Sequence, residues 1–449
     1  MTKQKPDARS IAAYVLDRVK AEQAFAAPVL DAALERYPEL DPRDRALATD
    51  LVYGSLRTAP YLESRLARLT RHGIDRLDPA VLSRLVVGAY QILFLDRVPA
   101  FAAVSEAVSA VTELRGTKLG AFTNAVLRRL AKEASDLTNK RALLEQATRE
   151  SIAPWLREAL VGSLGPDGAD AFIMELAAAP LDLRVRRGGD REATIAQLRG
   201  ALPGADVIAG RVSPLAIKLR GARDGRRLDL VKNGTLAVQE EGAQLVALSL
   251  GAEPGDIVLD ACAGRGNKTA VLAEQVGRSG AVGAVDAADQ HPQKLARLTS
   301  ELATLRLQAR ACYAVDWSVG TGDVPNGYDR VLVDAPCSGI GTLRRRPDLG
   351  TRRHPKSLAE LAALQIELVV RAGGRVKEGG TVVYAVCSVL REEGEDVVRA
   401  VLERAPFLRP APFAGDAARR LAGPGSTLRL TPYEHQTDGY FLASLVRQS

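Results

Sequence analysis

Residues 256–276 read DIVLDACAGRGNKTAVLAEQV, and this stretch decides the fold of the C-terminal half. The apolar run at 256–260 predicts a buried strand, and the apolar spacing at 270–276 predicts a helix. The small residues between them allow the backbone to approach a ligand closely at the helix N-terminus. The stretch is therefore typical of a βαβ unit that binds a ligand.

The same alternation of strand and helix continues along the chain. Apolar runs at 281–286, 328–334 and 380–385 predict further strands, and residues 293–305 predict a helix. Such alternation is typical of a mainly parallel sheet with helices on both faces. We therefore expect residues 236–449 to form a doubly wound, Rossmann-like α/β domain whose ligands bind at the carboxyl ends of the strands.

The N-terminal half follows a different pattern. Apolar residues recur at helical spacing through residues 1–140 and predict an all-α domain of five or more helices. Residues 141–235 mix glycines with short β-like pieces at 181–185 and 215–219, and predict a small α+β linking domain. The chain is thus expected to contain three domains.

The charge of the chain is unevenly distributed. Of its 449 residues 46% are hydrophobic and 26% charged, and the formal net charge is +7. Residues 184–232 contain twelve Lys and Arg against five Asp and Glu. This local excess predicts a basic surface on the linking domain that meets nucleic-acid phosphates, and an ordinary solvated surface is the alternative.

The four cysteines and four histidines argue against metal and disulfide sites. All four cysteines lie in the C-terminal half, too few and too widely spaced for a disulfide scaffold or a CxxC knuckle, and the histidines are scattered. No apolar run approaches the roughly 18 residues that a membrane helix needs. The first 20 residues lack the apolar core of a signal peptide. We expect a soluble, cytoplasmic protein without metal, and favour a monomer.

Carboxylates close or follow the predicted strands. In a doubly wound sheet such positions converge on one crevice. Asp286, taken as the end of the second strand, is placed to accept both hydroxyls of a ribose. The turn at 264–269 resembles G-x-G-x-x-G only loosely and lacks the Walker pattern. A nucleoside-type cofactor is expected, with a purely structural turn as the alternative. The four acidic residues are Asp260, Asp286, Asp316 and Asp334.

Two cysteines occupy equivalent positions after neighbouring strands. Cys337 follows the strand that ends at Asp334, Cys387 follows the strand at 380–385, and each is followed by serine. A single buried cysteine is usually an inert part of a core. Two thiols at one crevice instead predict chemistry, because a thiolate with access and a lowered pKa is a nucleophile.

These segments resemble the NOL/NOP/Sun family of RNA cytosine-5 methyltransferases, in particular the bacterial Sun/RsmB type that acts on small-subunit ribosomal RNA. The resemblance lies in DAPCSGIGT at 334–342, with LRR and PD shortly after it, and in CS at 387–388. It extends over nearly the whole chain. LVYGSLR at 51–57 and NAVLRR at 124–129 resemble a NusB-like helical RNA-binding domain, and PWL at 154–156 and VQEE at 238–241 resemble the linking segments.

The resemblance implies a role for each site residue. Cys387 attacks C6 of cytosine, Asp334 holds or protonates the ring at N3, and Cys337 assists release of the covalent adduct. S-adenosylmethionine supplies the methyl group, and ribosomal RNA is the partner. Cys262 is also expected to be a small packing residue, and Cys312 an inert core thiol. The cofactor-binding residues implied are Cys262, Ala263, Gly264, Arg265, Gly266, Asn267, Lys268, Asp286, Asp316 and Asp334.

The sequence departs from the family pattern at two places. AAPGGKT is usual in the first motif, but residues 263–269 read AGRGNKT. Asn267 is expected to tolerate the positive φ of a lost glycine, while the bulk of Arg265 puts the cofactor contacts in question. Val386 replaces the threonine that usually precedes the second cysteine.

Basic residues follow the first cysteine motif closely. We expect this run to clamp RNA phosphates beside the site and to hold a base out of its stack; a solvated charged loop is the alternative. The candidates are Arg344, Arg345, Arg346, Arg352 and Arg353.

Three hypotheses follow. The leading one is a ribosomal RNA 5-methylcytosine methyltransferase with a helical RNA-binding domain. The second is a non-catalytic RNA-binding or ribosome-assembly factor with a degenerate methyltransferase fold, supported by the altered first motif and Val386. The third, an NAD-linked dehydrogenase, shares the sheet but explains neither cysteine.

Overall fold

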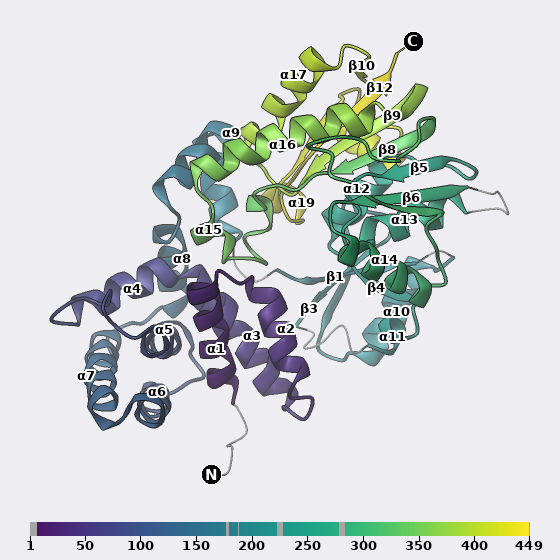
Figure 1. The fold of residues 1–449 in the computed structure, drawn as a ribbon. Helices are drawn as coiled ribbons and strands as arrows, with labels where there is room; N and C mark the ends of the chain where they lie inside the picture. Colours follow the sequence, from purple (N-terminus) through teal and green to yellow (C-terminus); the bar gives the residue numbers. More distant parts are fainter. Residues whose placement is uncertain (1–6, 177–178, 187, 222–227, 278–282, 449) are drawn as a thin grey trace. The chain divides into compact units, whose positions relative to one another are not determined.

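The computed structural model describes residues 7–176, 179–186, 188–221, 228–277 and 283–448 (Figure 1). The chain divides into two compact units. Unit 1 contains residues 1–157 together with 343–352, and unit 2 contains residues 158–342 and 353–449. The three-domain division expected from the sequence stays a prediction.

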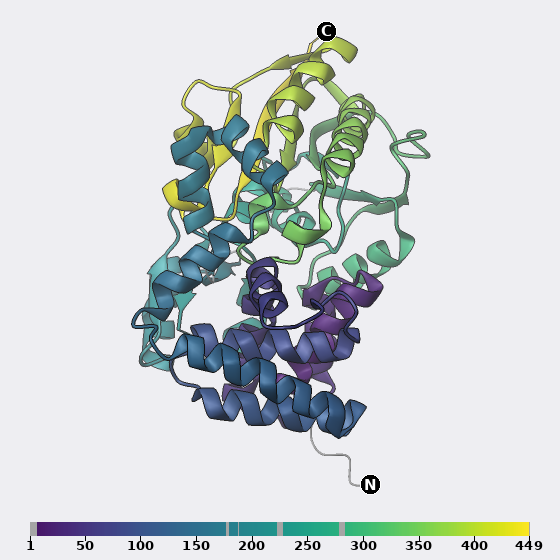
Figure 2. The ribbon, with the colours of Figure 1, turned by 90° about the vertical axis from the view of Figure 1, so that its left-hand side faces the viewer.

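Unit 1 is helical throughout its described residues, and its long helices pack side by side (Figure 2). Helix α5 lies at its centre, and all its residues from Val81 to Phe94 except Arg84 are buried, as expected of a mostly apolar helix that other helices surround. This confirms the predicted all-α domain. The helices are α1 (Ala8–Glu22), α2 (Ala26–Glu35), α3 (Pro42–Arg57), α4 (Ala59–Arg68), α5 (Pro79–Phe94), α6 (Ala100–Arg115), α7 (Thr117–Ala134), α8 (Lys140–Glu150) and α15 (Leu349–Arg352).

Asp-Pro pairs start two of these helices. The Asp41 carboxylate accepts a hydrogen bond of 2.7 Å from the backbone N–H of Arg43, and Pro42 is the first helical residue of α3. Asp78 does the same for Ala80 at 2.9 Å at the start of α5. The aspartate satisfies an otherwise unpaired N–H, and proline loses nothing at a position whose N–H has no helical partner.

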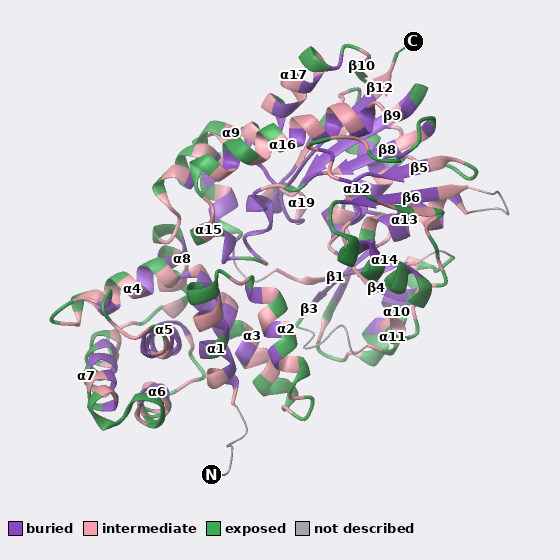
Figure 3. Cartoon of the chain, in the orientation of Figure 1, coloured by how far each residue is buried: buried purple, intermediate pink, exposed green. Residues whose placement is uncertain are grey.

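Unit 2 is built on an eight-stranded mixed sheet with buried strands (Figures 1 and 3). The order is β10-β12-β9-β8-β5-β6-β7, with β11 paired to β12. The five strands from β7 to β9 are parallel, and β12 is antiparallel to β9. The order reverses between β5 and β8, which is where a doubly wound sheet binds its ligand. The strands are β5 (Ile257–Asp260), β6 (Ala284–Asp289), β7 (Ala311–Ala314), β8 (Tyr328–Asp334), β9 (Val376–Val386), β10 (Leu408–Pro410), β11 (Thr427–Leu430) and β12 (Tyr440–Arg447).

Alternate residues of these strands pack on opposite faces of the sheet. Val331 and Val333 belong to the core under α16 and α17, whereas Leu332 packs with α12 and α13. Both faces are therefore covered, and the near-continuous apolar runs of the sequence follow from this double burial. The helices of unit 2 around this sheet are α9 (Pro154–Met174, which starts in unit 1), α12 (Glu241–Ser249), α13 (Asn267–Val276), α14 (Pro292–Thr304), α16 (Pro355–Gly373), α17 (Glu395–Arg404), α18 (Asp416–Ala422) and α19 (Pro432–His435).

A smaller antiparallel sheet lies in the same unit, in the order β2-β3-β1-β4. Its core is formed by apolar residues of the strands and of α10. The elements are β1 (Leu181–Val185), α10 (Arg191–Ala201), β2 (Asp206–Ala209), β3 (Ala216–Arg220), α11 (Asp229–Lys232) and β4 (Leu236–Val238).

The prediction that residues 184–232 form a basic surface is wrong for three of their cations, which form ion pairs within the protein. Arg184 and Arg186 both pair with Glu274, at 2.5 and 2.7 Å, and Lys218 pairs with Glu241 at 2.7 Å. The side chains of Arg184 and Lys218 are 1% and 0% exposed. These charges hold the small sheet against the rest of the unit and cannot reach a phosphate. Arg187, Arg223, Arg226 and Arg227, also counted there, lie outside the described residues.

The strand expected at 281–286 is displaced along the sequence. Strand β6 runs from Ala284 to Asp289, and residues 281–282 lie outside the described residues. Asp286 is therefore in the middle of the strand rather than at its end. This shift of three residues changes which carboxylate reaches the ligand edge.

No described helix combines the length and apolarity needed to cross a bilayer. Within the described part of the chain, no group of three or more His, Cys, Asp or Glu side chains is arranged to hold a metal ion.

The buried Lys218–Glu241 pair gives a prediction for stability. Lys218→Met leaves the Glu241 carboxylate buried without its cation, and such a loss typically destabilises by about 3–5 kcal/mol. The ammonium also donates to the carbonyl of Gln436 at 2.5 Å. We expect the urea midpoint of unfolding to fall accordingly.

The double variant Lys218→Met/Glu241→Gln should recover much of this loss, because a glutamine oxygen can still accept from the backbone N–H of Val212 and Ser213. Lys232→Met, at an exposed lysine, is the matched control. Equal effects of Lys218→Met and Lys232→Met would contradict the prediction.

Candidate active site

The carboxyl ends of β8 and β9 bring two thiols together. Asp334, the last residue of β8, pairs in register with Ala385 of β9, so Cys337 and Cys387 follow adjacent strand ends. Their sulfur atoms lie 3.2 Å apart, and both side chains are partly accessible. The structure thus places together the two cysteines that the sequence singled out.

The loop after Asp334 depends on two glycines for its shape. Gly339 adopts a φ of +76°, which disfavours other residues. Gly341 donates to the carbonyl of Cys387 at 3.1 Å and accepts from Gly439 at 2.8 Å. A Cβ on Gly341 would lie 2.0 Å from the Gly439 carbonyl oxygen. These glycines allow the loop to pack directly onto the segment before β12 and onto the Cys387 loop.

A cation from the first motif reaches Asp334. The Lys268 ammonium lies 2.5 Å from the Asp334 carboxylate, and the two side chains are 16% and 24% exposed. Burial alone would lower the pKa of Lys268, but the Asp334 carboxylate outweighs it and raises that pKa. Cys387 is also close enough to act electrostatically on Lys268. Lys268 therefore brings a positive charge to Asp334 and Cys387.

Beneath this pair lies a buried carboxyl group. Asp260, at the end of β5, is 1% exposed and accepts a hydrogen bond of 2.7 Å from the Thr269 hydroxyl. Burial raises the pKa of Asp260 to about 7, with a further contribution from Asp334. The last two residues of the first motif thus have separate partners: Lys268 binds Asp334, and Thr269 binds Asp260.

The turn between β5 and α13 keeps its shape despite the altered motif. Positive φ values occur at Gly264 (+56°) and Gly266 (+88°), and a Cβ on Gly266 would lie 2.8 Å from Leu298. Asn267 is the first residue of α13, and the positive φ expected there does not occur. Arg265 is exposed, and its bulk meets no core.

Asp286 does not lie where the sequence reasoning placed it. It is fully buried within β6, where it pairs with Arg310 at 2.5 Å and accepts from the Tyr328 hydroxyl at 2.7 Å. The position of β6 in the sequence explains this burial of Asp286. The strand ends at Asp289, whose carboxylate accepts from the backbone N–H of Gly264 at 3.1 Å. The sequence carries a second aspartate three residues before Pro292, and its carboxylate accepts from the backbone N–H of His291 at 2.9 Å.

Asp316 and Asp289 lie at neighbouring strand ends. Asp316 follows β7, is half-buried, and accepts from Ser318 and Gln290. The hydrogen bonds from Ser318 hold the pKa of Asp316 below its ordinary value. The carboxylate is thus ionised and fixed, as suits a group that binds donors of a ligand.

Cys262 lies as the sequence predicted, whereas Cys312 does not. Cys262 is partly buried in the turn, and burial raises its pKa well above the ordinary value, which fits a packing role. Cys312, expected to be a core thiol, is exposed on β7. A short edge strand carries it, and alternate residues of that strand face solvent.

The arginines expected to clamp RNA do not form one exposed set. Arg344 is 6% exposed, whereas Arg346 is exposed. Arg352 donates to the carbonyl of Ala24 at 2.6 Å, and its guanidinium lies over the Phe25 ring. Arg345, which is half-buried, also interacts within the protein. Burial of Arg344 argues against a phosphate contact there.

Arg353 donates to the carbonyls of Ser338 at 3.0 Å and Cys337 at 3.3 Å. The Arg353 side chain therefore binds the loop that carries Cys337 and is not part of an open phosphate-binding surface. The run of basic residues read from the sequence as one clamp consists of cations with different partners.

The turn between β5 and α13 and the carboxyl groups beside it suit a ligand that carries hydroxyl and amino groups. A Cβ built on Gly264 finds its nearest neighbour, the Cys262 carbonyl oxygen, at 4.0 Å, so the backbone there is open to a ligand. The carboxyl groups at the ends of β6 and β7 can accept hydroxyl and amino hydrogens. The two thiols and Asp334 lie at the end of the next strands, where a second substrate would meet the first.

The raised pKa of Asp260 gives a pH prediction. The folded state keeps the proton up to about pH 7, while the unfolded chain releases it near its ordinary value of about 4. The contribution to stability is therefore present at low pH and is lost as pH rises between these two values. We expect Asp260→Asn to gain stability relative to wild type as pH rises from 4 to 7, by urea unfolding.

Asp323→Asn, at an exposed aspartate, is the matched control and should show no such trend. A difference between Asp260→Asn and wild type that does not change with pH would contradict the assignment.

Two family models match the chain. One, described as 16S rRNA methyltransferase RsmB/F, matches residues 247–446, and one, described as NusB family, matches residues 6–132. They cover the large sheet of unit 2 and most of the helices of unit 1.

Curated relatives match over almost the entire length. The chain is 35% identical to "Ribosomal RNA small subunit methyltransferase B" of Pseudomonas putida, over 98% of each protein. It is 30% identical to "Probable ribosomal RNA small subunit methyltransferase B" of Bacillus subtilis, over 98% of this chain and 99% of that protein.

Solved structures share the fold. The crystal structure of PH0851 covers 99% of this chain and all of its own, with a TM-score of 0.80 and 23% identity. NSun6 from Pyrococcus horikoshii, crystallised with SFG, covers 67% of this chain and 99% of its own, with a TM-score of 0.56 and 18% identity. Because relatives at 30% identity or more span nearly the whole sequence, the chain belongs to the RsmB/F family of S-adenosylmethionine-dependent methyltransferases of small-subunit ribosomal RNA.

Proposed function

We propose that this protein methylates C5 of a cytosine in small-subunit ribosomal RNA through a covalent adduct between Cys387 and C6. The observation that carries the proposal is the pair of accessible thiols 3.2 Å apart, beside the Asp334 carboxylate. One thiol would suffice for attack alone. A second thiol within contact distance of the first supports a reaction in which one sulfur attacks and the other completes the release.

Covalent attack answers a chemical requirement. C5 of cytosine is too electron-poor to take a methyl group unless a nucleophile first adds to C6. In the proposed reaction the Cys387 sulfur bonds to C6, and the electrons of the C5–C6 double bond make C5 nucleophilic. Bound S-adenosylmethionine supplies the methyl group that C5 receives. Loss of the C5 proton then lets the S–C6 bond break and restores the double bond.

Three side chains support these steps. The Lys268 ammonium interacts electrostatically with Cys387 and would stabilise negative charge on the attacking sulfur. We assign to Asp334, which Lys268 binds, the role of holding or protonating the base at N3. We assign to Cys337, in contact with Cys387, the role of assisting release of the adduct after C5 has lost its proton.

The cofactor residues proposed from the sequence need one replacement. The turn at 262–268 would surround S-adenosylmethionine, Asp316 would accept from its base, and Asp334 would lie beside its reacting end. Asp289 takes the ribose in place of Asp286, because it ends β6 and holds the turn through Gly264.

The altered first motif and Val386 were the two observations that favoured a non-catalytic assembly factor, and neither distorts the site. The altered turn keeps its glycines at positive φ, and Val386 is simply buried in the core of β9. We propose ribosomal RNA as the partner, bound in part by the NusB-like helical domain, in the cytoplasm where that RNA is found.

The two cysteine variants should fail differently. With labelled S-adenosylmethionine and small-subunit RNA, Cys387→Ala should give neither 5-methylcytosine nor adduct, because no thiolate attacks C6. Cys337→Ala should accumulate a covalent protein–RNA complex that survives a denaturing gel. Digestion of the RNA followed by mass spectrometry measures 5-methylcytosine.

Cys312→Ala, at the exposed thiol on β7, is the matched control and should turn over normally. The same phenotype from Cys337→Ala and Cys387→Ala would show that the roles are assigned wrongly. Absence of 5-methylcytosine from naked RNA and from partly assembled subunits alike would refute the reaction.

Asp289→Asn should weaken binding of S-adenosylmethionine by about 10–100-fold, since a hydrogen bond to a charged group contributes about 1.5–3 kcal/mol. Calorimetric titration measures the affinity. Asp323→Asn serves as the control, and equal affinities for Asp289→Asn and wild type would remove Asp289 from the cofactor site.

A further inference from the structure

A buried carboxylate lies directly behind the two thiols. Glu393, in the short 3₁₀ turn η4 (Arg391–Glu393) before α17, is 0% exposed. No part of the proposed reaction uses it. Burying a carboxylate is costly unless strong hydrogen bonds compensate it, so its contacts indicate what it does.

Those contacts converge on the residue that follows Cys337. One carboxylate oxygen accepts from the backbone N–H of Ser338 at 2.7 Å, and the other accepts from the Ser338 hydroxyl at 2.5 Å. Gln365 donates to Glu393 at 3.0 Å and also to the carbonyl of Pro336 at 3.0 Å. The Glu393–Gln365 pair thus binds the chain on both sides of Cys337.

The segment around Cys337 is also bound by Arg353, which lies just before α16. Arg353 donates to the carbonyl oxygens of Ser338 and Cys337, as described above. In the loop that carries Cys337, side chains therefore bind the N–H and hydroxyl of Ser338 and the carbonyls of Pro336, Cys337 and Ser338. The Ser338 hydroxyl also lies 3.4 Å from the Ser388 hydroxyl, which links this loop to the one that carries Cys387.

We propose that Glu393 is a positioning residue for Cys337: by holding Ser338, its carboxylate fixes the Cys337 thiol against Cys387 in the geometry that adduct release requires. The inference rests on the proposed function, and adds a residue that does not touch the substrate. The two thiols also differ in their electrostatic surroundings, with Lys268 near Cys387 and the Glu393 carboxylate near Cys337.

This asymmetry favours the protonated form of Cys337. The hydrogen bond with Cys387, burial and the charge of Glu393 all raise the pKa of the Cys337 thiol. Cys337 is thereby kept from competing as the nucleophile, while Cys387 has a cation beside it. Because the same carboxylate also holds Ser338, its loss should impair release of the adduct, in which Cys337 acts, rather than formation of the adduct by Cys387.

The decisive variant is Glu393→Gln, which keeps the size of the side chain but removes its charge. Turnover should fall by about 10²-fold, as expected from misplacement of a reacting group, and the covalent RNA complex should accumulate as in Cys337→Ala. The KM for RNA should fall together with turnover, so that kcat/KM stays close to the wild-type value, because formation of the adduct is not affected. The pH dependence of adduct release should move to lower pH, because one cause of the raised Cys337 pKa is gone.

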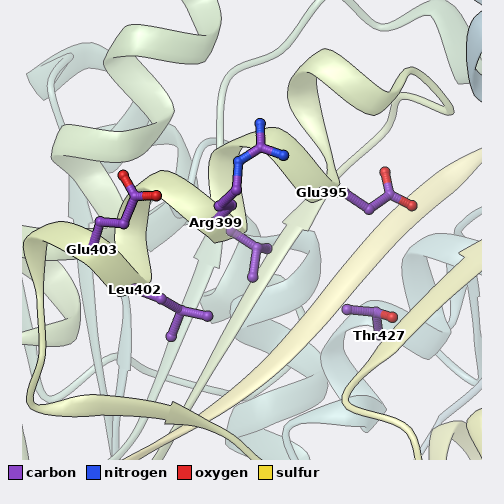
Figure 4. A pocket seen from close by; sticks show the side chains of 6 residues that line it. Glu395, Arg399, Leu402, Glu403 and Thr427 are labelled. Carbon is purple, nitrogen blue, oxygen red and sulfur yellow. The ribbon is translucent and has the colours of Figure 1, made fainter.

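Glu403→Gln is the matched control. Glu403 lies on α17 and lines an exposed hollow with Glu395, Arg399, Leu402 and Thr427 (Figure 4). This variant should release the adduct at the wild-type rate. A merely structural role of Glu393 would lower adduct formation and release together, and would leave the pH dependence of release in place.

Ser338→Ala keeps the inference testable if Glu393→Gln does not fold. It removes the hydroxyl contact but leaves the backbone N–H bound to Glu393, so a smaller defect in the same step is expected. If Glu393→Gln folds and releases the adduct at the normal rate, Glu393 is not a positioning residue. If Glu393→Gln does not fold, normal release by Ser338→Ala overturns the inference instead. If wild type forms no 5-methylcytosine, the proposed function fails first and this inference falls with it.

Discussion

The register between β8 and β9 is the constraint on which the site depends. Parallel pairing of Asp334 with Ala385 makes the two strands end at the same level. Each chain then turns away from the sheet, and the residues two or three positions later meet. A shift of one residue in this pairing would turn alternate side chains to the opposite face and would separate the two sulfurs. The chemistry is therefore specified by backbone pairing before any side chain contributes.

Below the strand ends, polar groups are buried in a fixed arrangement. Ser338, Ser388 and Glu393 are each at most 1% exposed, whereas Cys337 and Cys387 keep partial access. Accessible reactive groups thus rest on a fully bonded layer. Buried charged groups also hold elements together elsewhere in unit 2. Its buried cations, Arg184 and Lys218, serve to hold elements together, so the positive net charge of the chain is a poor guide to where RNA binds.

Much of this could be predicted from the sequence because its signals are local. Strand, turn and helix in residues 256–276 follow from apolar spacing and small residues, and the two cysteines follow strands directly. Asp289 and Glu393 were missed for a different reason. Asp286 interrupts an apolar strand, and only its distant partners Arg310 and Tyr328 explain its burial. Glu393 follows another glutamate in a loop, a pattern typical of a solvated surface, while its partner Ser338 is 55 residues away.

The contact of Gly341 with Gly439 has a consequence for the order of folding. The thiol loop packs against the segment that leads into β12, about a hundred residues later in the chain, and glycine is needed on both sides. Contacts so far apart in sequence form late, because the intervening chain must first be ordered. During synthesis β5, β8 and both cysteines can all be present while the loop still lacks its support. We therefore expect the loop after Asp334 to reach its final packing only when β12 joins the sheet, although the pairing of β8 with β9 can form before that.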